Sequence, residues 1–360
     1  MITYIAARSS VLDWIRDLGQ ETQTFFPQPM GKNSFEFKKV RKHSVLEFEK
    51  PLSPSPRKEF RASSNIVPPG KKLSPSKEIL FTFARNEDGE VEFTPVHNQE
   101  PRILAGVRPC DLRAIYLMDR VNGKSPADPN YLMRRKETLI IAHDCLQPCD
   151  DKCFCDAVGS LRARDGADIF LTPLEEEILI ECLTKEGEEL AKKGHFELCT
   201  DVKAKKDWAE AHRAEPFGRQ LDAPLEMINK VMTEQWDSSV WKKHIERCFS
   251  CGTCNLVCPT CYCFDVHDDL NVEDPSTGVR YRTWDACMLP DFSEVAGDHN
   301  FRPEPEARQR HRVKRKFEYL PTDMGELSYC VGCGRCAQQC TVDIDIYTIV
   351  NDLLETAEAN

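Results

Sequence analysis

The sequence predicts two domains, an α/β or α+β domain over residues 1–235 and a mostly α-helical domain over residues 236–360. A length of 360 residues is enough to bury two cores. In the first part, short apolar runs alternate with helical patterns, which is typical of a sheet covered by helices. The third observation is the placement of the 18 cysteines, because none precedes Cys110 and most lie in clusters after residue 236.

The individual elements follow from apolar spacing. A first helix is predicted over residues 10–19, with Ser10 as its N-cap, and a second over residues 111–121. Four apolar runs are too short for buried helices and are predicted strands, at residues 79–83, 103–107, 139–141 and 178–180. The polar stretch 200–237 gives the domain boundary. The chain ends in a predicted helix that starts near Ile346 and that Asp343 or Asp345 can cap.

Composition excludes several classes of protein. Apolar residues make up 41% and charged residues 30% of the chain, as in globular proteins. The net charge of −11 argues against general nucleic-acid binding. The sequence has no 18-residue apolar run and no signal peptide, so neither a membrane span nor export is expected. It also lacks the glycine-rich dinucleotide and nucleotide motifs, so no bound flavin or NAD is predicted in this chain.

Two rows of cysteines near the end share one spacing. Each row reads C-x2-C-x2-C-x3-C, and the rows consist of Cys248, Cys251, Cys254 and Cys258, then Cys330, Cys333, Cys336 and Cys340. This spacing is typical of [4Fe–4S] binding, in which the fourth cysteine of each row ligates the other cluster. We therefore expect one cluster on Cys248, Cys251, Cys254 and Cys340, and a second on Cys330, Cys333, Cys336 and Cys258.

Zinc is the alternative, but zinc sites usually show two short cysteine pairs with four ligands in all. Two complete rows of four fit iron–sulfur better. The 71 residues between Cys258 and Cys330 exceed what a small ferredoxin needs. The sequence therefore predicts a helical two-cluster domain that carries an insertion.

A third group of cysteines lies before the boundary. Cys110 and Cys145 each follow a predicted strand, at the sheet edge where α/β proteins bind ligands. A thiol at the start of the helix after Cys110 is expected to favour the thiolate. With Cys153 and Cys155 these two could hold a third [4Fe–4S] cluster, with Cys149 as a spare or alternate ligand. A structural zinc ion and free thiols stay open as alternatives.

Other features carry weaker signals. Cys261, Cys263 and Cys287 could support a cluster, form a redox pair or ligate something further. The lone Cys182 and Cys199 are expected to be core thiols. The basic run over residues 302–316 could dock an acidic partner or form a solvated helix face.

Several segments together resemble a known family. They are GVRPCDLRAI (106–115), CFC (153–155), CGTCNLVCPTCYC (251–263), RTWDAC (282–287), HNFRP (299–303) and CVGCGRC (330–336). From about residue 100 onward the chain resembles the iron–sulfur beta subunits of soluble sulfhydrogenases and related NiFe hydrogenases, and the corresponding iron–sulfur component of anaerobic sulfite reductase. Two departures are Thr341, where a proline is usual, and the additional Cys149 before CFC.

The resemblance implies a cytoplasmic, hetero-oligomeric oxidoreductase. In it, this chain would relay electrons between a flavin subunit that handles NAD(P)H and a catalytic subunit such as a hydrogenase or reductase. No substrate site of its own is expected. The alternative is a subunit that itself reduces a sulfur compound or disulfide, with Cys261, Cys263 and Cys287 beside a cluster. The terminal acceptor, the cluster potentials and the direction of flow cannot be read from the sequence.

Overall fold

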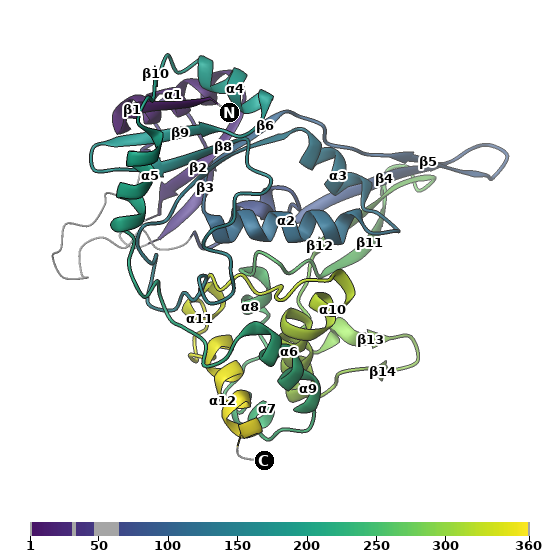
Figure 1. Ribbon diagram of the computed structural model, residues 1–360. Helices are drawn as coiled ribbons and strands as arrows, with labels where there is room; N and C mark the ends of the chain where they lie inside the picture. Colours follow the sequence, from purple (N-terminus) through teal and green to yellow (C-terminus); the bar gives the residue numbers. More distant parts are fainter. Residues whose placement is uncertain (1, 31–33, 47–64, 359–360) are drawn as a thin grey trace.

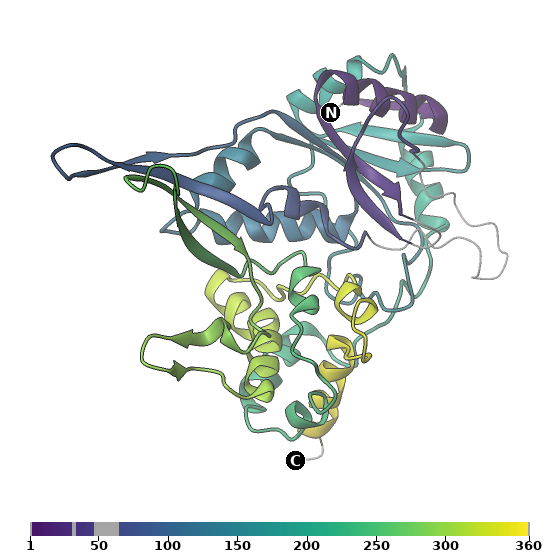
Figure 2. The same ribbon diagram turned by 180° about the vertical axis from the view of Figure 1, so that it is seen from behind.

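The structure is a computed structural model that describes residues 2–30, 34–46 and 65–358. Figure 1 shows a sheet with its helices in the upper part and the C-terminal helices below it. Two pairs of strands project sideways from the junction of these parts as an arm, which Figure 2 shows from behind.

The upper part is built on an eight-stranded mixed sheet with the order β10-β1-β9-β8-β7-β6-β2-β3. The pairs β2–β6, β6–β7 and β7–β8 are parallel, and the other four pairs are antiparallel. The strands are β1 (Thr3–Ala7), β2 (Gln23–Pro29), β3 (Phe35–Lys39), β6 (Arg102–Val107), β7 (Thr138–His143), β8 (Ile169–Pro173), β9 (Glu177–Cys182) and β10 (Glu197–Leu198).

Helices cover both faces of this sheet, which explains why its central strands are apolar throughout. On one face, Ile103 and Ala105 of β6 join the core of α1, and on the other, Leu104 and Val107 join that of α2. The helices of this part are α1 (Arg8–Glu21), α2 (Pro109–Gly123), α3 (Pro129–Lys136), α4 (Lys185–Lys192) and α5 (Val202–Ala211), with a 3-10 turn η1 (Pro69–Lys72).

All four predicted strands and both predicted helices of this part are present, with longer bounds. The prediction that Ser10 caps the first helix is wrong, because α1 begins at Arg8 and its N-cap is Ala7, without a side-chain hydrogen bond. The second helix begins at Pro109, not at Asp111. Proline suits that first position because it has no N–H group to leave unpaired.

The arm is a second, antiparallel sheet of four strands in the order β11-β12-β4-β5. One hairpin is β4 (Lys77–Arg85) with β5 (Val91–Pro95), and the other is β11 (Phe264–Leu270) with β12 (Thr277–Trp284). β12 pairs with β4 along its length, so the sheet takes one hairpin from each side of residue 235. At its base the buried Glu78 pairs with Arg134 and Arg282.

The lower part contains α6 (Leu225–Glu234), α7 (Val240–Lys243), α8 (Thr253–Leu256), η2 (Asp291–Ser293), β13 (Glu294–Val295), β14 (His299–Asn300), α9 (Pro305–Lys314), the π-helical turn η3 (Arg315–Tyr319), α10 (Leu320–Met324), α11 (Arg335–Gln338) and α12 (Ile346–Glu358). Its core joins α6, α7, η3 and α12 through Ile228, Trp241, Phe317 and Ile349. Asp345 caps α12 by accepting the Tyr347 N–H at 3.0 Å. Asp343 has a left-handed backbone instead.

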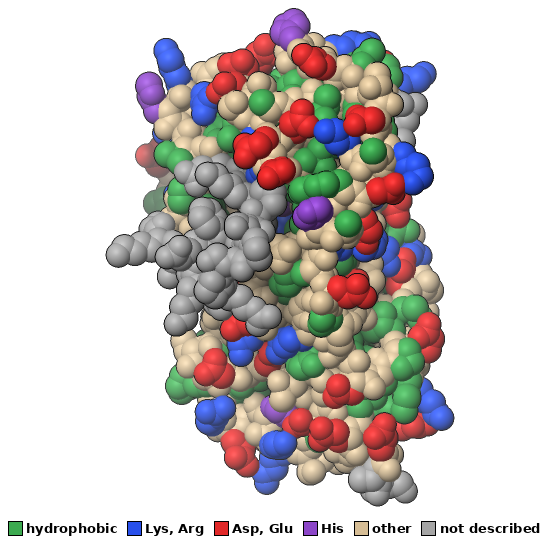
Figure 3. Space-filling view, turned by 60° about the vertical axis from the view of Figure 1, so that its left-hand side comes forward, with side chains coloured by type: hydrophobic (Ala, Val, Ile, Leu, Met, Phe, Trp, Pro, Cys, Tyr) green, Lys and Arg blue, Asp and Glu red, His purple; other side chains and the backbone are tan. Residues whose placement is uncertain are grey.

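The described helices are all too short or too polar to cross a membrane. On the face in Figure 3, acidic and basic side chains are interspersed where described residues form the surface. That face therefore presents no broad basic field of the kind that binds nucleic acid.

Candidate metal centres

The two cysteine rows fold in the same way locally. In the first row, Gly252 has a φ of 73° and begins α8, which carries Cys254. In the second row, Gly334 has a φ of 76° and begins α11, which carries Cys336. These left-handed glycines let each row reverse direction tightly before its short helix, so the first three cysteines of each row lie on one turn.

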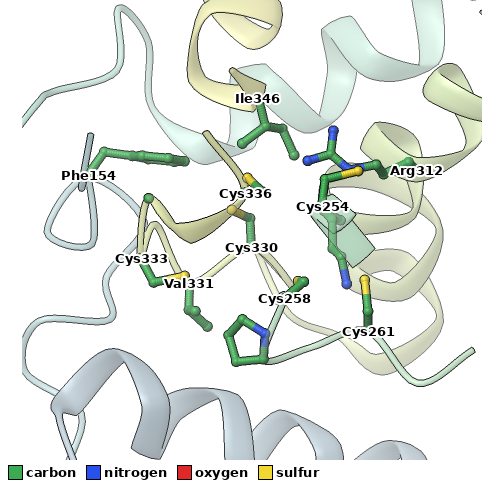
Figure 4. A pocket seen from close by; sticks show the side chains of 13 residues that line it. Phe154, Cys254, Cys258, Cys261, Arg312, Cys330, Val331, Cys333, Cys336 and Ile346 are labelled. Atoms are coloured by element: carbon green, nitrogen blue, oxygen red, sulfur yellow. The ribbon is translucent and has the colours of Figure 1, made fainter. Parts of the chain in front are cut away.

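The structure brings cysteines of the two rows together in two adjoining cavities. One is lined by Cys248, Cys251, Cys254 and Cys340. The other is lined by Cys258, Cys330, Cys333 and Cys336, and also by Cys254 and Cys261 (Figure 4). The fourth cysteine of each row thus lies at the cavity of the other row, where the predicted ligand sets require it.

Backbone and burial favour sulfur that is bound rather than free. The N–H groups of Ser250 and Ile344 each donate to a cysteine sulfur, of Cys248 and Cys340, at 3.3 Å. Such hydrogen bonds tune cluster potentials. Burial raises the pKa of Cys333 to about 12 and that of Cys336 to about 11. These thiols therefore stay protonated unless a metal replaces the proton.

Three buried cations surround the cavities. Arg312 lines both of them, Lys316 lines the second, and Lys71 reaches the same region from η1. Their hydrogen bonds go to neutral oxygens, of Gln309, Thr260 and Cys261. Although burial lowers the pKa of Arg312 and Lys316, nearby cysteine thiolates raise it overall.

Buried cations without anions are costly. A cubane held by four thiolates is an anion, so these residues fit such a group. The two interpretations of the basic run over residues 302–316 are wrong for its central members. Arg308, Arg312, Lys314 and Lys316 are at most 5% exposed, so they neither form a solvated face nor meet a partner.

Within the described residues, no three His, Cys, Asp or Glu side chains are grouped closely enough to hold one metal ion. A cubane requires a wider arrangement, because each of its thiolates binds a separate iron.

The cysteines of the third group lie between the sheet and the second row. Cys110 is in the first turn of α2, Cys145 follows β7, and Cys153 and Cys155 lie in the next loop. Cys110, Cys145 and Cys155 share one buried cluster, which also contains Cys333. Cys149 is hydrogen-bonded to Cys153. The expectation of a thiolate at Cys110 is wrong for the metal-free chain, because burial raises its pKa well above the ordinary value.

The loop with Cys153 and Cys155 packs directly on the second row. The Phe154 N–H donates to the Gly332 carbonyl at 2.7 Å. A Cβ on Gly332 would lie only 2.5 Å from the carbonyl carbon and oxygen of Phe154. Arg335, in the second row, donates to both oxygens of Asp111 at 2.6 and 2.7 Å in a fully buried ion pair. The three groups of cysteines therefore lie one after another.

Cys261, Cys263 and Cys287 lie close together beside the two cavities. The Asn255 amide donates to the sulfurs of Cys287 at 3.2 Å and Cys261 at 3.6 Å. The Cys287 thiol donates in turn to Cys263. Asn255, Arg312 and Lys71 escaped the sequence analysis. A polar or charged residue in a loop or helix gives no sign of its burial.

The family comparisons agree with this arrangement. A family model described as a 4Fe-4S dicluster domain matches residues 247–344, a range that includes both rows. The chain is therefore an iron–sulfur protein of the 4Fe–4S dicluster class.

A longer match gives the family. The chain is 33% identical to sulfhydrogenase 2 subunit beta of Pyrococcus furiosus over 320 residues, which are 88% of this chain and 91% of that subunit. It belongs to the family of sulfhydrogenase beta subunits, so the resemblance noted in the sequence is confirmed. No solved structure matches.

Proposed function

We propose that this chain relays electrons in a cytoplasmic hetero-oligomeric complex, between a flavin subunit that handles NAD(P)H and a catalytic subunit of hydrogenase or reductase type. The family supports a subunit role, since the similar protein is itself named a subunit of a sulfhydrogenase. Clusters of this kind transfer single electrons, which suits a step between two-electron centres.

The observation that carries the proposal is the serial arrangement of cysteine groups. The two cavities share Cys254 and Arg312 in their linings, so groups bound in them would be neighbours. The third group adjoins the second row through Phe154 and Gly332. At the other end, Cys251 is exposed. We infer a path from the α/β part through both rows to the surface near Cys251.

We also propose a third [4Fe–4S] cluster on Cys110, Cys145, Cys153 and Cys155. Three of these sulfurs share a buried cluster beside Cys333, which supports a common ligand. Cys149 is the spare thiol, and structural zinc or free thiols are the competing outcomes.

The test is an iron and acid-labile sulfide count on chain purified without oxygen, with EPR of the reduced sample. About twelve irons per chain support all three clusters, and about eight support the two rows alone. Stoichiometric zinc with almost no iron would overturn the electron relay.

Single variants assign the ligands. We expect Cys251→Ser, Cys333→Ser and Cys155→Ser each to lower the iron content by up to about four per chain. Cys182→Ser is the matched control, since Cys182 is a buried thiol in the core of the large sheet. Unchanged iron and EPR signals in any of the first three variants would remove that residue from its ligand set.

A further inference from the structure

Cys263 and Cys287 form a close pair outside all the predicted ligand sets. They lie at the base of the β11–β12 hairpin, where Phe264 pairs with Trp284 and the Asp285 N–H donates to the Cys263 carbonyl at 3.0 Å. This register brings residue 287 back beside residue 263. Both the thiol and the backbone N–H of Cys287 donate to the Cys263 sulfur.

The surroundings prepare this pair for oxidation. A hydrogen bond from Cys287 lowers the pKa of Cys263 to about 6, against the opposing effect of burial. Lys316 and Lys71 add positive charge nearby. Thiolate is the form of cysteine that reacts in disulfide chemistry.

The pair is also next to the clusters. The buried Asn255 donates to Cys287 and directly follows Cys254, which lines both cavities. Cys287 is only 5% exposed, so a bulky external disulfide cannot reach its sulfur. An internal couple fits this burial better than a substrate site.

We propose that Cys263 and Cys287 form a reversible dithiol–disulfide couple that exchanges two electrons with the two row clusters. On oxidation, one S–S bond forms between the two sulfurs and the S–H bond of Cys287 breaks. Its proton, with that of Cys263 where this thiol is protonated, goes to water. Two electrons leave, and each oxidised cluster takes one. The proposal rests on the proposed function for its electron acceptors.

The test uses the full chain with its clusters intact. Samples are equilibrated without oxygen at a series of potentials in dithiol–disulfide buffers. They are then denatured in acid, treated with N-ethylmaleimide and mapped by mass spectrometry. We expect the labelling of Cys263 and Cys287 to be lost together, with a two-electron slope and a linked peptide. Cys182 should be labelled at every potential, as the internal control.

A second readout counts electrons. Starting from the oxidised chain, dithionite titration should deliver about two more electrons to the wild type than to the Cys263→Ser/Cys287→Ser double variant. The Cys182→Ser variant should match the wild type. Iron content should be equal in all three proteins.

Two results would overturn the proposal. One is labelling of both thiols at every potential in the iron-loaded wild type. The other is a loss of about four irons in the double variant, which would make the pair cluster ligands. A disulfide in wild-type chain that contains no iron would instead overturn the electron relay and the exchange with clusters, while leaving the thiol couple in place. The wild-type measurements decide the matter even if the variants do not fold.

Discussion

The two cysteine rows have the same spacing but different surroundings, and one position shows the difference best. Ser250 in the first row and Gly332 in the second are equivalent, and both have a left-handed backbone, with φ of 51° and 62°. A serine is accommodated in the first row, where its hydroxyl accepts from Arg308 at 3.1 Å. In the second row the Phe154 backbone occupies the space that a side chain would need. The spacing thus determines the turn, and the neighbours determine which residues the turn accepts.

The neighbours also separate the two rows in their access to water. Cys251 and Phe249 of the first row are exposed, whereas Cys333 of the second is 8% exposed and lies against the third group. The first row suits contact with a partner, and the second suits internal transfer.

The largest effect is expected from the ion pair that only the second row has. Asp111→Asn leaves Arg335 as a buried charge without its partner, and the cost should be about 3–5 kcal/mol. The control is Glu210→Gln, which breaks an exposed pair with Arg162 and should cost less than about 1 kcal/mol. Guanidinium unfolding under argon measures both. Equal losses would show that the second row does not depend on this contact.

The next effect comes from exchanging the equivalent residues. Gly332→Ser places a Cβ 2.5 Å from Phe154 backbone atoms and should cost about 3 kcal/mol. Gly325→Ala is the matched control, because Gly325 has a φ of 64° but no atoms within 4 Å of its Cβ position. It should cost only about 1 kcal/mol. A Gly332→Ser variant as stable as Gly325→Ala would remove the packing explanation.

Arg312 tests what the rows share, because it lines both cavities. Arg312→Gln removes a buried positive charge, so both cluster potentials should fall by on the order of 100 mV. Arg310→Gln, on the same helix but half-buried and paired with Glu306, should shift them much less. EPR-monitored redox titration measures the shifts. A change in only one signal would mean that the cation serves one row.

The smallest effect is expected from the reverse exchange. Ser250→Gly relieves the left-handed strain but loses the hydrogen bond from Arg308, so stability should change by less than about 1 kcal/mol. Thermal unfolding at one scan rate compares it with wild type. A loss as large as that of Gly332→Ser would mean that the two turns are equally crowded.

The sequence predicted what depends on local spacing and missed what depends on distant contacts. Apolar runs located β6, β7 and β9, and cysteine spacing located both rows. The pairing of β4 with β12 could not be predicted, because nothing in either strand specifies a partner almost two hundred residues away.

Burial also limited the prediction of the sites. The run over residues 302–316 reads as solvated because its composition is basic, yet Arg312 and Lys316 are buried beside cysteines. Cys110 was expected to be a thiolate from its place on a helix, but desolvation outweighs the helix dipole there.

The arm has a consequence for the order in which the chain is made. An isolated two-stranded hairpin is marginally stable in water. The β4–β5 hairpin leaves the ribosome early and gains its neighbour only after β12 has followed, when the first cysteine row is complete and the second is still to come. Since domains form from the N-terminus during synthesis, β4 keeps an open edge for most of translation. Maturation of the first row and closure of that edge therefore fall in the same interval.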